Sequence, residues 1–226
     1  MKRNMSLLSS DLDRVIKPNI ALLRQCGLSV RDIADMCSRK ARMLTFSPER
    51  TKEVKLRVEE LGIVVPRRLG SLKHTVSAVA NTAKETNAAK LEFLKSTLDC
   101  SKSEIATAVS KVPSILRMSE DSLLRKIQFM INEAGLEPQY ILGRPVLLTY
   151  SLEKRLVPRH CLMKVLLAKG LLKSNLSFST MANIGEKTFR LKFIDSHKDS
   201  VTGLADAYSA ARGGGVPPPA FFSLTS

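Results

Sequence analysis

The sequence has few of the residues that build metal sites, disulfide frameworks and aromatic platforms. It contains no Trp, three His and four Cys, and aromatic residues make up only 5% of the chain. No H-E-x-x-H or C-x-x-C pattern occurs. No metal site is therefore expected, and the four thiols are predicted to be reduced core residues. They are Cys26, Cys37, Cys100 and Cys161.

Long apolar runs and enzyme motifs are also missing. Charged residues interrupt every apolar stretch before it reaches the roughly 18 to 20 residues that cross a membrane, so we expect a soluble chain. No phosphate-loop or G-x-S-x-G motif is present. Residues 1–18 contain no signal-peptide core, and Asp11 and Asp13 argue against a transit peptide. The sequence predicts a protein that is not an enzyme, uses no cofactor, and has lost or lacks any targeting segment.

Positive charge is the main signal in the composition. The chain has 36 Lys and Arg against 21 Asp and Glu, a formal net charge of +15. Residues 39–73 hold ten basic and four acidic residues, and residues 138–192 hold ten and two, which gives +6 and +8. Residues 74–137 balance at eight against eight. An excess concentrated in two zones favours a polyanionic partner, nucleic acid above all.

A regular period runs through the sequence. Similar stretches place Gly27, Gly62, Asp99, Gly135 and Gly170 at equivalent points, separated by 35, 37, 36 and 35 residues. A compact globular fold has no reason to produce this regularity, whereas stacked helical repeats require it. The sequence therefore predicts about five repeat units.

Each unit has the pattern of two helices followed by a connector. Leu123, Ile127 and Met130 fall at helical spacing ahead of Gly135, a suitable helix C-cap. Around Asp99, one stripe comprises Leu91, Leu94 and Leu98, and a second comprises Ile105, Val109 and Val112. We interpret these stripes as the core between stacked units, because apolar residues at this spacing are far more often core than a binding groove.

Proline and serine mark where the connectors end. Pro113 and Pro145 begin short segments that cannot continue the preceding helix. Ser119 and Ser151 follow, and each is able to cap the next helix through its side-chain oxygen. The predicted fold class is thus all-α, a helical-repeat (α-solenoid) superhelix with Pro-led connectors.

The block RPVLLTYSLEKRLVPR, residues 144–159, resembles the mitochondrial transcription termination factor (mTERF) family, in particular its plant organellar branch. The resemblance covers roughly residues 7 to 210. It is supported by Gly27-Leu28-Ser29 before Asp32-Ile33-Ala34, by Ser47-Pro48-Glu49 and by Lys192-Phe193-Ile194. Ala41 stands where the family usually has Pro, Asp99 stands where it has Gly, and the second unit has no Pro near the equivalent point at Val76, so we expect these points to be looser or differently turned. Fewer units are present than family members often have, as in a C-terminal portion or a short member.

The resemblance implies how the fold is used. Each unit would be two antiparallel helices plus a short 3₁₀ turn, stacked into a curved superhelix whose basic concave face lies along a double helix. Family members act in the mitochondrion or chloroplast, in transcription termination, transcription initiation and intron splicing. We therefore expect a monomeric regulator of organellar transcription with double-stranded DNA as its partner.

Eight basic residues, most of them near junctions between helices and connectors, are the candidate phosphate contacts. They are Arg39, Lys40, Arg42, Lys111, Arg117, Arg144, Arg155 and Arg159. We expect alanine at Arg144 or Arg159 to weaken binding without unfolding the chain. A competing interpretation is that cations near helix C-termini complement the helix dipole. With few aromatic residues, recognition of duplex shape and backbone is favoured over base stacking, although Tyr140 and Tyr150 remain stacking candidates.

Two other functions stay open from the sequence. The same surface would serve an RNA-binding factor for intron splicing or ribosome assembly, and a helical solenoid is also a common protein–protein scaffold. The predicted domains are a repeat domain over residues 1–211 and a flexible Gly/Pro-rich tail over residues 212–226.

Overall fold

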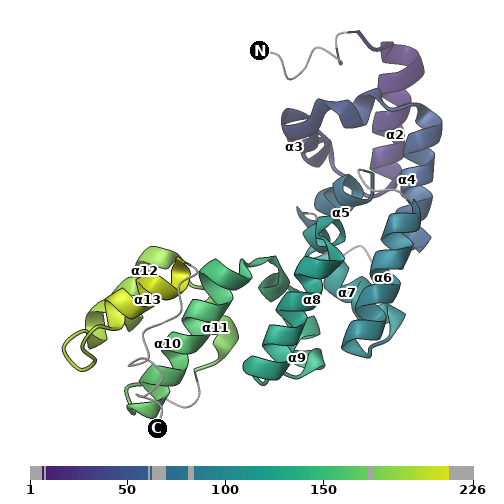
Figure 1. Ribbon diagram of the computed structural model, residues 1–226. Helices are drawn as coiled ribbons and strands as arrows, with labels where there is room; N and C mark the ends of the chain where they lie inside the picture. The colour runs from purple at the N-terminus through teal and green to yellow at the C-terminus, as the bar shows by residue number, and fades with distance from the viewer. Residues whose placement is uncertain are drawn as a thin grey trace. The chain divides into compact units, whose positions relative to one another are not determined.

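The computed structural model describes residues 7, 9–60, 62, 70–80, 84–172 and 176–213, and for residues 39–42, 70–73 and 84 it describes the backbone alone. This part of the chain contains twelve α-helices and no strand (Figure 1). The helices are α2 (Lys17–Gln25), α3 (Val30–Lys40), α4 (Pro48–Glu60), α5 (Gly70–Ala80), α6 (Lys84–Leu98), α7 (Lys102–Lys111), α8 (Glu120–Gln128), α9 (Pro138–Gly143), α10 (Val157–Ala168), α11 (Phe178–Asn183), α12 (Glu186–Phe193) and α13 (Leu204–Arg212).

Short segments of tighter or wider helix complete the pattern. The 3₁₀ turns are Ala41–Thr45, Pro113–Arg117, Pro145–Thr149 and Asp195–His197, and the π-helical turns are Leu12–Ile16, Phe129–Glu133 and Leu152–Leu156. The 3₁₀ turns at Pro113 and Pro145 stand where Pro-led connectors are predicted. The order of elements confirms the predicted all-α helical-repeat fold.

Left-handed backbone marks every predicted repeat point. The φ angles are 89° at Gly27, 62° at Gly62, 45° at Asp99, 62° at Gly135 and 67° at Gly170. Each of these residues lies between the two helices of a pair, where the chain reverses after a helix C-terminus. Gly203, 33 residues after Gly170, has a φ of 77° and separates α12 from α13. The described chain thus holds six helix pairs, one more than the sequence period indicated.

Two of the three departures from the family pattern form the usual turns. Asp99 adopts the same left-handed conformation as the glycines, and Ala41 begins a 3₁₀ turn as Pro113 and Pro145 do. For these two points the expectation of a different turn is wrong. At Val76 the second unit does differ, since helix α5 continues through this residue. An Asp side chain reaches the left-handed region at lower cost than most residues because it hydrogen-bonds locally, and a 3₁₀ turn needs no proline.

Both predicted serine caps are present. The Ser119 hydroxyl accepts a hydrogen bond from the Ser122 backbone N–H at 3.3 Å. The Ser151 hydroxyl accepts one from the Lys154 N–H at 3.1 Å. Each cap satisfies a backbone donor that the first turn of a helix leaves without an intrahelical partner.

The chain divides into two compact units, which we describe separately. Unit 1 comprises residues 1–124 and 138–145, and unit 2 comprises residues 125–137 and 146–226. In unit 1, α2 contacts α4, α4 contacts α5, and α5 and α6 both contact α7. The predicted stripes supply its core, since Leu94, Leu98, Ile105 and Val109 are each 1–2% exposed.

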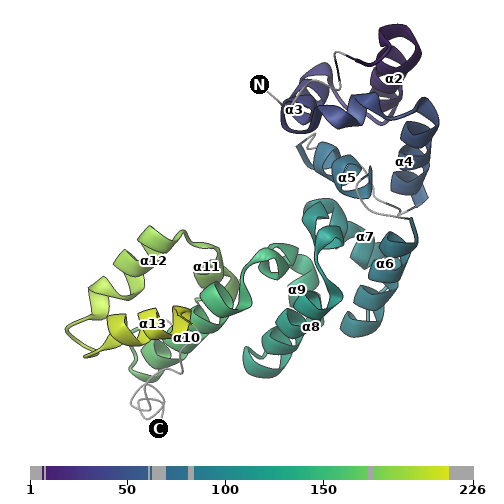
Figure 2. The ribbon, with the colours of Figure 1, turned by 45° about the horizontal axis from the view of Figure 1, so that its top comes forward.

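Unit 2 has a continuous apolar core of its own. Helix α10 packs against α11 and α13 (Figure 2). Leu162, Met181, Phe189 and Tyr208 are fully buried at its centre. Ile127 and Met130, from the stripe ahead of Gly135, are also buried. The stripes therefore form core, as predicted.

A buried donor recurs on the first helix of four repeats. Each donor is a polar side chain that reaches a backbone carbonyl near the end of the same repeat. Asn19 Nδ2 donates to Leu44 O and Phe46 O at 2.9 and 2.7 Å, Lys90 Nζ to Met118 O at 2.8 Å, Lys126 Nζ to Leu148 O at 2.9 Å, and Arg159 Nη1 to Met181 O at 2.8 Å. These bonds satisfy buried carbonyls that would otherwise lack a partner.

Two further observations concern membrane spans and the C-terminal end of the described residues. None of their helices combines the length and apolar character of a membrane span. Helix α13 ends at Arg212, the first residue of the predicted tail. The remainder of the predicted tail, residues 214–226, lies outside the described residues.

Candidate nucleic-acid interface

The structure separates the eight candidate contacts into distinct groups. Arg39 and Lys40 end α3, and Arg42 lies in the 3₁₀ turn that follows, but their side chains lie outside the described residues. Lys111 ends α7 and Arg117 ends the turn Pro113–Arg117. Both are exposed, and neither has a hydrogen-bond or ion-pair partner within the described chain. They remain available to a phosphate.

Arg144 is exposed and stacked on an aromatic ring. Its guanidinium lies 4.1 Å from the centre of the Tyr140 ring. This cation–π contact holds the side chain without using its five N–H donors, because the attraction is to the face of the ring. Arg144 therefore stays competent to bind a phosphate, while one face of Tyr140 is occupied.

Arg159 does not fit the role that the sequence predicts. Its side chain is fully buried. Nη1 donates to Met181 O, Ala182 O and Ile184 O at 2.8, 3.1 and 2.6 Å, and Nη2 pairs with Glu186 Oε2 at 3.0 Å. A residue engaged in this way has a structural role in unit 2, and we remove it from the candidate contacts.

Arg155 lies one helical turn before Arg159 and reaches the surface. Ser151 caps the π-helical turn that carries it, and residues four apart share one face of a helix. Arg155 Nη2 donates to Ile184 O at 2.7 Å, and the guanidinium lies 4.3 Å from the centre of the Tyr150 ring. Burial, reinforced by the neighbouring charge of Arg159, lowers the pKa of Arg155 below its usual value. The Glu186 carboxylate opposes this shift without cancelling it.

Arg155 opens onto a hollow in the surface of unit 2 with a volume of about 450 Å³. We call it the cationic hollow. It is lined by Thr149, Tyr150, Ser151, Lys154, Arg155, Arg159, Glu186 and Arg212. Four of these residues are cationic and one is anionic, which leaves a formal charge of +3.

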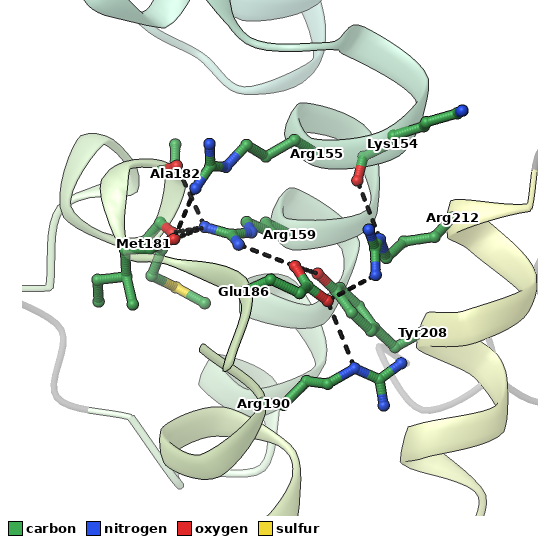
Figure 3. A network of polar contacts seen from close by, with 10 residues as sticks. Lys154, Arg155, Arg159, Met181, Ala182, Glu186, Arg190, Tyr208 and Arg212 are labelled. Carbon is green, nitrogen blue, oxygen red and sulfur yellow. Dashed lines mark hydrogen bonds and ion pairs between the residues drawn. The ribbon is translucent and has the colours of Figure 1, made fainter. Parts of the chain in front are cut away.

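Glu186 is the hub of the network behind the hollow (Figure 3). Arg159, Arg190 and Arg212 converge on its carboxylate from three directions, with closest distances of 3.0, 3.4 and 2.7 Å. Burial opposes ionisation of Glu186, yet the hydrogen bond from Arg159 and the charge of Arg212 outweigh it and keep the pKa of the carboxyl below its usual value. A single carboxylate thus holds several guanidinium groups together.

The lining of the hollow also includes the Lys154 ammonium group and the hydroxyl groups of Thr149, Tyr150 and Ser151. The Lys154 side chain extends away from the Glu186 network, as Figure 3 shows. Tyr150 Oη bonds to Asn183 Oδ1 at 2.5 Å. Arg and Lys donors around a surface hollow that lacks matching carboxylates form a suitable site for a phosphate group, which Arg binds through paired N–H donors.

Comparison with known proteins decides the family. The family model mTERF matches residues 1–190. The chain belongs to the mTERF family. It is 23% identical over 188 residues to "Transcription termination factor MTERF8, chloroplastic" of Arabidopsis thaliana, which covers 81% of this chain and 35% of that protein. It is 28% identical over 95 residues to "Transcription termination factor MTEF18, mitochondrial" of the same plant, which covers 42% of this chain and 17% of that protein. The chain thus spans about a third or less of these relatives.

The mTERF match confirms the predicted family, and it includes most of the residues that line the hollow. Lys154, Arg155 and Glu186 fall inside the matched residues, whereas Arg212 lies beyond them. The sequence assigned Arg212 to the tail because the glycine run begins directly after it. Its bonds to Lys154 O at 3.2 Å and to Glu186 place it in unit 2 instead.

Sequence reasoning also missed Lys154 and Arg190. Lys154 adjoins Arg155 within the block that carries the family resemblance, so its position was a usable signal. Arg190 follows Glu186 by four residues in α12, a spacing that predicts an ion pair on one helix face. Arg190 meets Arg159 at Glu186, and Lys154 lies beside them, only because the helices that carry these residues pack together. Sequence spacing does not show this packing.

Proposed function

We propose that this mTERF chain regulates organellar transcription by binding double-stranded DNA, and that the cationic hollow of unit 2 holds backbone phosphates. The observation that carries the proposal is that two cations of the hollow, Lys154 and Arg155, have no carboxylate partner within the described residues, whereas Arg159 and Arg212 share Glu186. The relatives are named transcription termination factors, one chloroplastic and one mitochondrial. These names support an organellar role in transcription.

The electrostatics of Arg155 favour an anion at this place. Burial and the repulsion from Arg159 both disfavour its charged form. A phosphate in the hollow would stabilise the charged form of Arg155 and accept N–H donors directly. Phosphate contacts fix the position of a protein on a duplex but read no bases. The hollow is therefore proposed as a positioning contact.

The aromatic residues favour a duplex over an unpaired strand. Tyr140 and Tyr150 are the stacking candidates of the sequence, and each has an arginine over one face of its ring at 4.1 and 4.3 Å. A base that stacks there has to displace the arginine or use the other face. Single-strand binders instead present open aromatic platforms.

Salt-dependent binding tests the proposal. The purified chain is titrated with a labelled DNA duplex at several salt concentrations, and log K is plotted against log[salt]. Each phosphate contact contributes about 0.9 to the slope on B-DNA. The Lys154→Gln/Arg155→Gln variant should bind the duplex more weakly and should lower the slope by about one to two units. Circular dichroism shows whether the variant is folded.

The control is Lys198→Gln, an exposed cation of unit 2 that does not line the hollow. Equal affinity and slope for the two variants would refute the role of the hollow. Competition with a structured RNA shows which nucleic acid the chain prefers. Preferential retention of RNA would favour a splicing or ribosome-assembly factor. Failure to retain either polynucleotide at modest salt would favour a protein–protein scaffold.

A further inference from the structure

Arg155 is held in place by two contacts that come from different elements. Its Nη2 donates to Ile184 O at 2.7 Å, and its guanidinium lies 4.3 Å from the centre of the Tyr150 ring. Ile184 is the C-cap of α11, and carbonyl groups at a helix C-terminus have no intrahelical partner. Tyr150 directly follows the 3₁₀ turn Pro145–Thr149. The hydrogen bond and the ring together restrict the movement of the guanidinium.

Tyr150 is itself anchored to the same end of α11. Its hydroxyl donates a hydrogen bond to Asn183 Oδ1 at 2.5 Å. Asn183 is the last residue of α11 and directly precedes Ile184. The ring and the carbonyl that hold Arg155 are therefore both tied to two adjacent residues at one helix end. We call Tyr150, Asn183 and Ile184 the Arg155 clamp.

The clamp determines which nitrogen of Arg155 a ligand reaches. Nε is buried and has no hydrogen-bond partner, and Nη2 is engaged by Ile184 O. Nη1 has no hydrogen-bond partner among the described residues and is not buried. Because Arg155 lines the cationic hollow, Nη1 is the donor that it offers to a phosphate there.

A side chain that is fixed before binding gives up less freedom when the ligand arrives. A mobile arginine loses rotamer freedom when it contacts a phosphate, and this loss weakens binding. The clamp imposes the loss during folding instead. We propose that Tyr150 and Asn183 are positioning residues, which hold Arg155 so that Nη1 points to a backbone phosphate of the duplex. This inference rests on the proposed function, because it concerns how the hollow prepares its phosphate contact.

Titration of the purified chain and its variants with a labelled DNA duplex tests the clamp. Tyr150→Leu removes the ring and the hydroxyl but keeps every cation of the hollow. It should bind the duplex about two- to tenfold more weakly, the effect expected when one side chain loses its fixed position. Tyr150→Phe keeps the ring and should bind more tightly than Tyr150→Leu. Equal affinity of Tyr150→Leu and the unaltered chain would overturn the proposal.

A double-mutant cycle distinguishes positioning from a structural role or from direct stacking of Tyr150 on a base. If Tyr150 acts through Arg155, Tyr150→Leu should cause no further loss of affinity in a chain that already carries Arg155→Gln. Additive losses would mean that Tyr150 acts independently of Arg155, and they contradict the proposal. Arg155→Lys keeps the charge but lacks the planar group that stacks on the ring. It should bind about two- to tenfold more weakly than the unaltered chain, and equal affinity would show that charge alone suffices.

Asn183→Ala tests the anchor of the clamp even if Tyr150→Leu fails to fold, because Asn183 is exposed. It removes the same hydrogen bond as Tyr150→Phe, so the two variants should weaken duplex binding to the same extent, by about twofold or more. The matched control is Asn132→Ala, an exposed asparagine of unit 2 that does not line the hollow. Equal affinity of Asn183→Ala and Asn132→Ala would contradict the anchoring role of Asn183. Circular dichroism and the melting temperature show whether each variant is folded.

The single variant Arg155→Gln separates the failure of this inference from that of the proposed function. If Arg155→Gln binds the duplex as the unaltered chain does, Arg155 is not a phosphate contact and the clamp has no role in binding. If Arg155→Gln weakens binding while Tyr150→Leu does not, the hollow keeps its proposed function and only the clamp is refuted.

Discussion

The buried guanidinium of Arg159 gives the sharpest test of the structure. Replacement by methionine keeps most of the volume of the aliphatic stem and removes every donor. Three backbone carbonyls and the Glu186 carboxylate then lose a partner at 2.6–3.1 Å. The contact of the guanidinium with the Phe189 ring at 4.2 Å is also lost. The variant leaves buried acceptors without a donor inside the core of unit 2.

The magnitude follows from these contacts. A single hydrogen bond to a charged group contributes about 1.5–3 kcal/mol, and bonds in one network do not add independently. Breaking a buried ion pair from one side costs about 3–5 kcal/mol. We therefore expect Arg159→Met to lower the free energy of unfolding by about 3–5 kcal/mol. For a chain of this size, that is a fall in melting temperature of roughly 6–20 °C.

Thermal and urea unfolding followed by circular dichroism measure this loss. The matched control is Arg190→Met, which removes a 3.4 Å ion pair to the same carboxylate, a 3.1 Å hydrogen bond to the Ser209 hydroxyl and a distant contact with the Tyr208 ring, from a side chain that is 38% exposed. Exposed pairs contribute about 0–1 kcal/mol, so the control should be nearly neutral. If Arg159→Met and Arg190→Met unfold within about 1 kcal/mol of each other, the structural role assigned to Arg159 is wrong.

Three further predictions concern stability. Asp99→Gly should stabilise the chain by about 0.5 kcal/mol in urea unfolding, because glycine reaches the left-handed φ of 45° without strain and only part of that gain is lost to its greater freedom when unfolded; a less stable variant would contradict this. The folded pKa of Glu186 is lowered, so its contribution to stability is complete above its unfolded pKa and is lost as pH falls through the folded pKa. A series of melting temperatures between about pH 6 and pH 3 should therefore fall less steeply for Glu186→Gln, and parallel curves would argue against the Glu186 network. Ile127→Asp should lower the melting temperature by several degrees, since it places an unpaired charge at a position that is 1% exposed, and an unchanged melting temperature would show that this stripe is not core.

The repeat architecture was predictable because short sequence signals mark the turn and the end of each helix pair. A left-handed turn after a helix favours glycine, and proline cannot continue a helix, so both residues leave a mark at fixed intervals. The five predicted points all have positive φ. Gly203 escaped the sequence analysis although its interval from Gly170 is close to the others, because the flanking residues no longer resemble the earlier units.

The candidate site was less predictable because it depends on which charges are buried. Arg159 and Arg155 look alike in sequence, four residues apart in one basic segment. Only the packing around α10 distinguishes them, since it surrounds Arg159 with carbonyl groups and leaves Arg155 half-buried beside the hollow. The pairing of Arg159 with residues 22 to 27 positions later has no local signature.

The donor that ties the first helix of a repeat to a carbonyl at its far end bears on how such proteins are recombined. The four donor side chains differ in length and in charge; they are Asn19, Lys90, Lys126 and Arg159. Each therefore fits the position of its own acceptor carbonyl. A chimaera joined inside a repeat would combine a donor from one protein with a turn from another. Either the donor or the acceptor carbonyl would then be buried without a hydrogen-bond partner. Junctions placed between repeats keep each match intact, which makes the whole repeat the natural module for exchange.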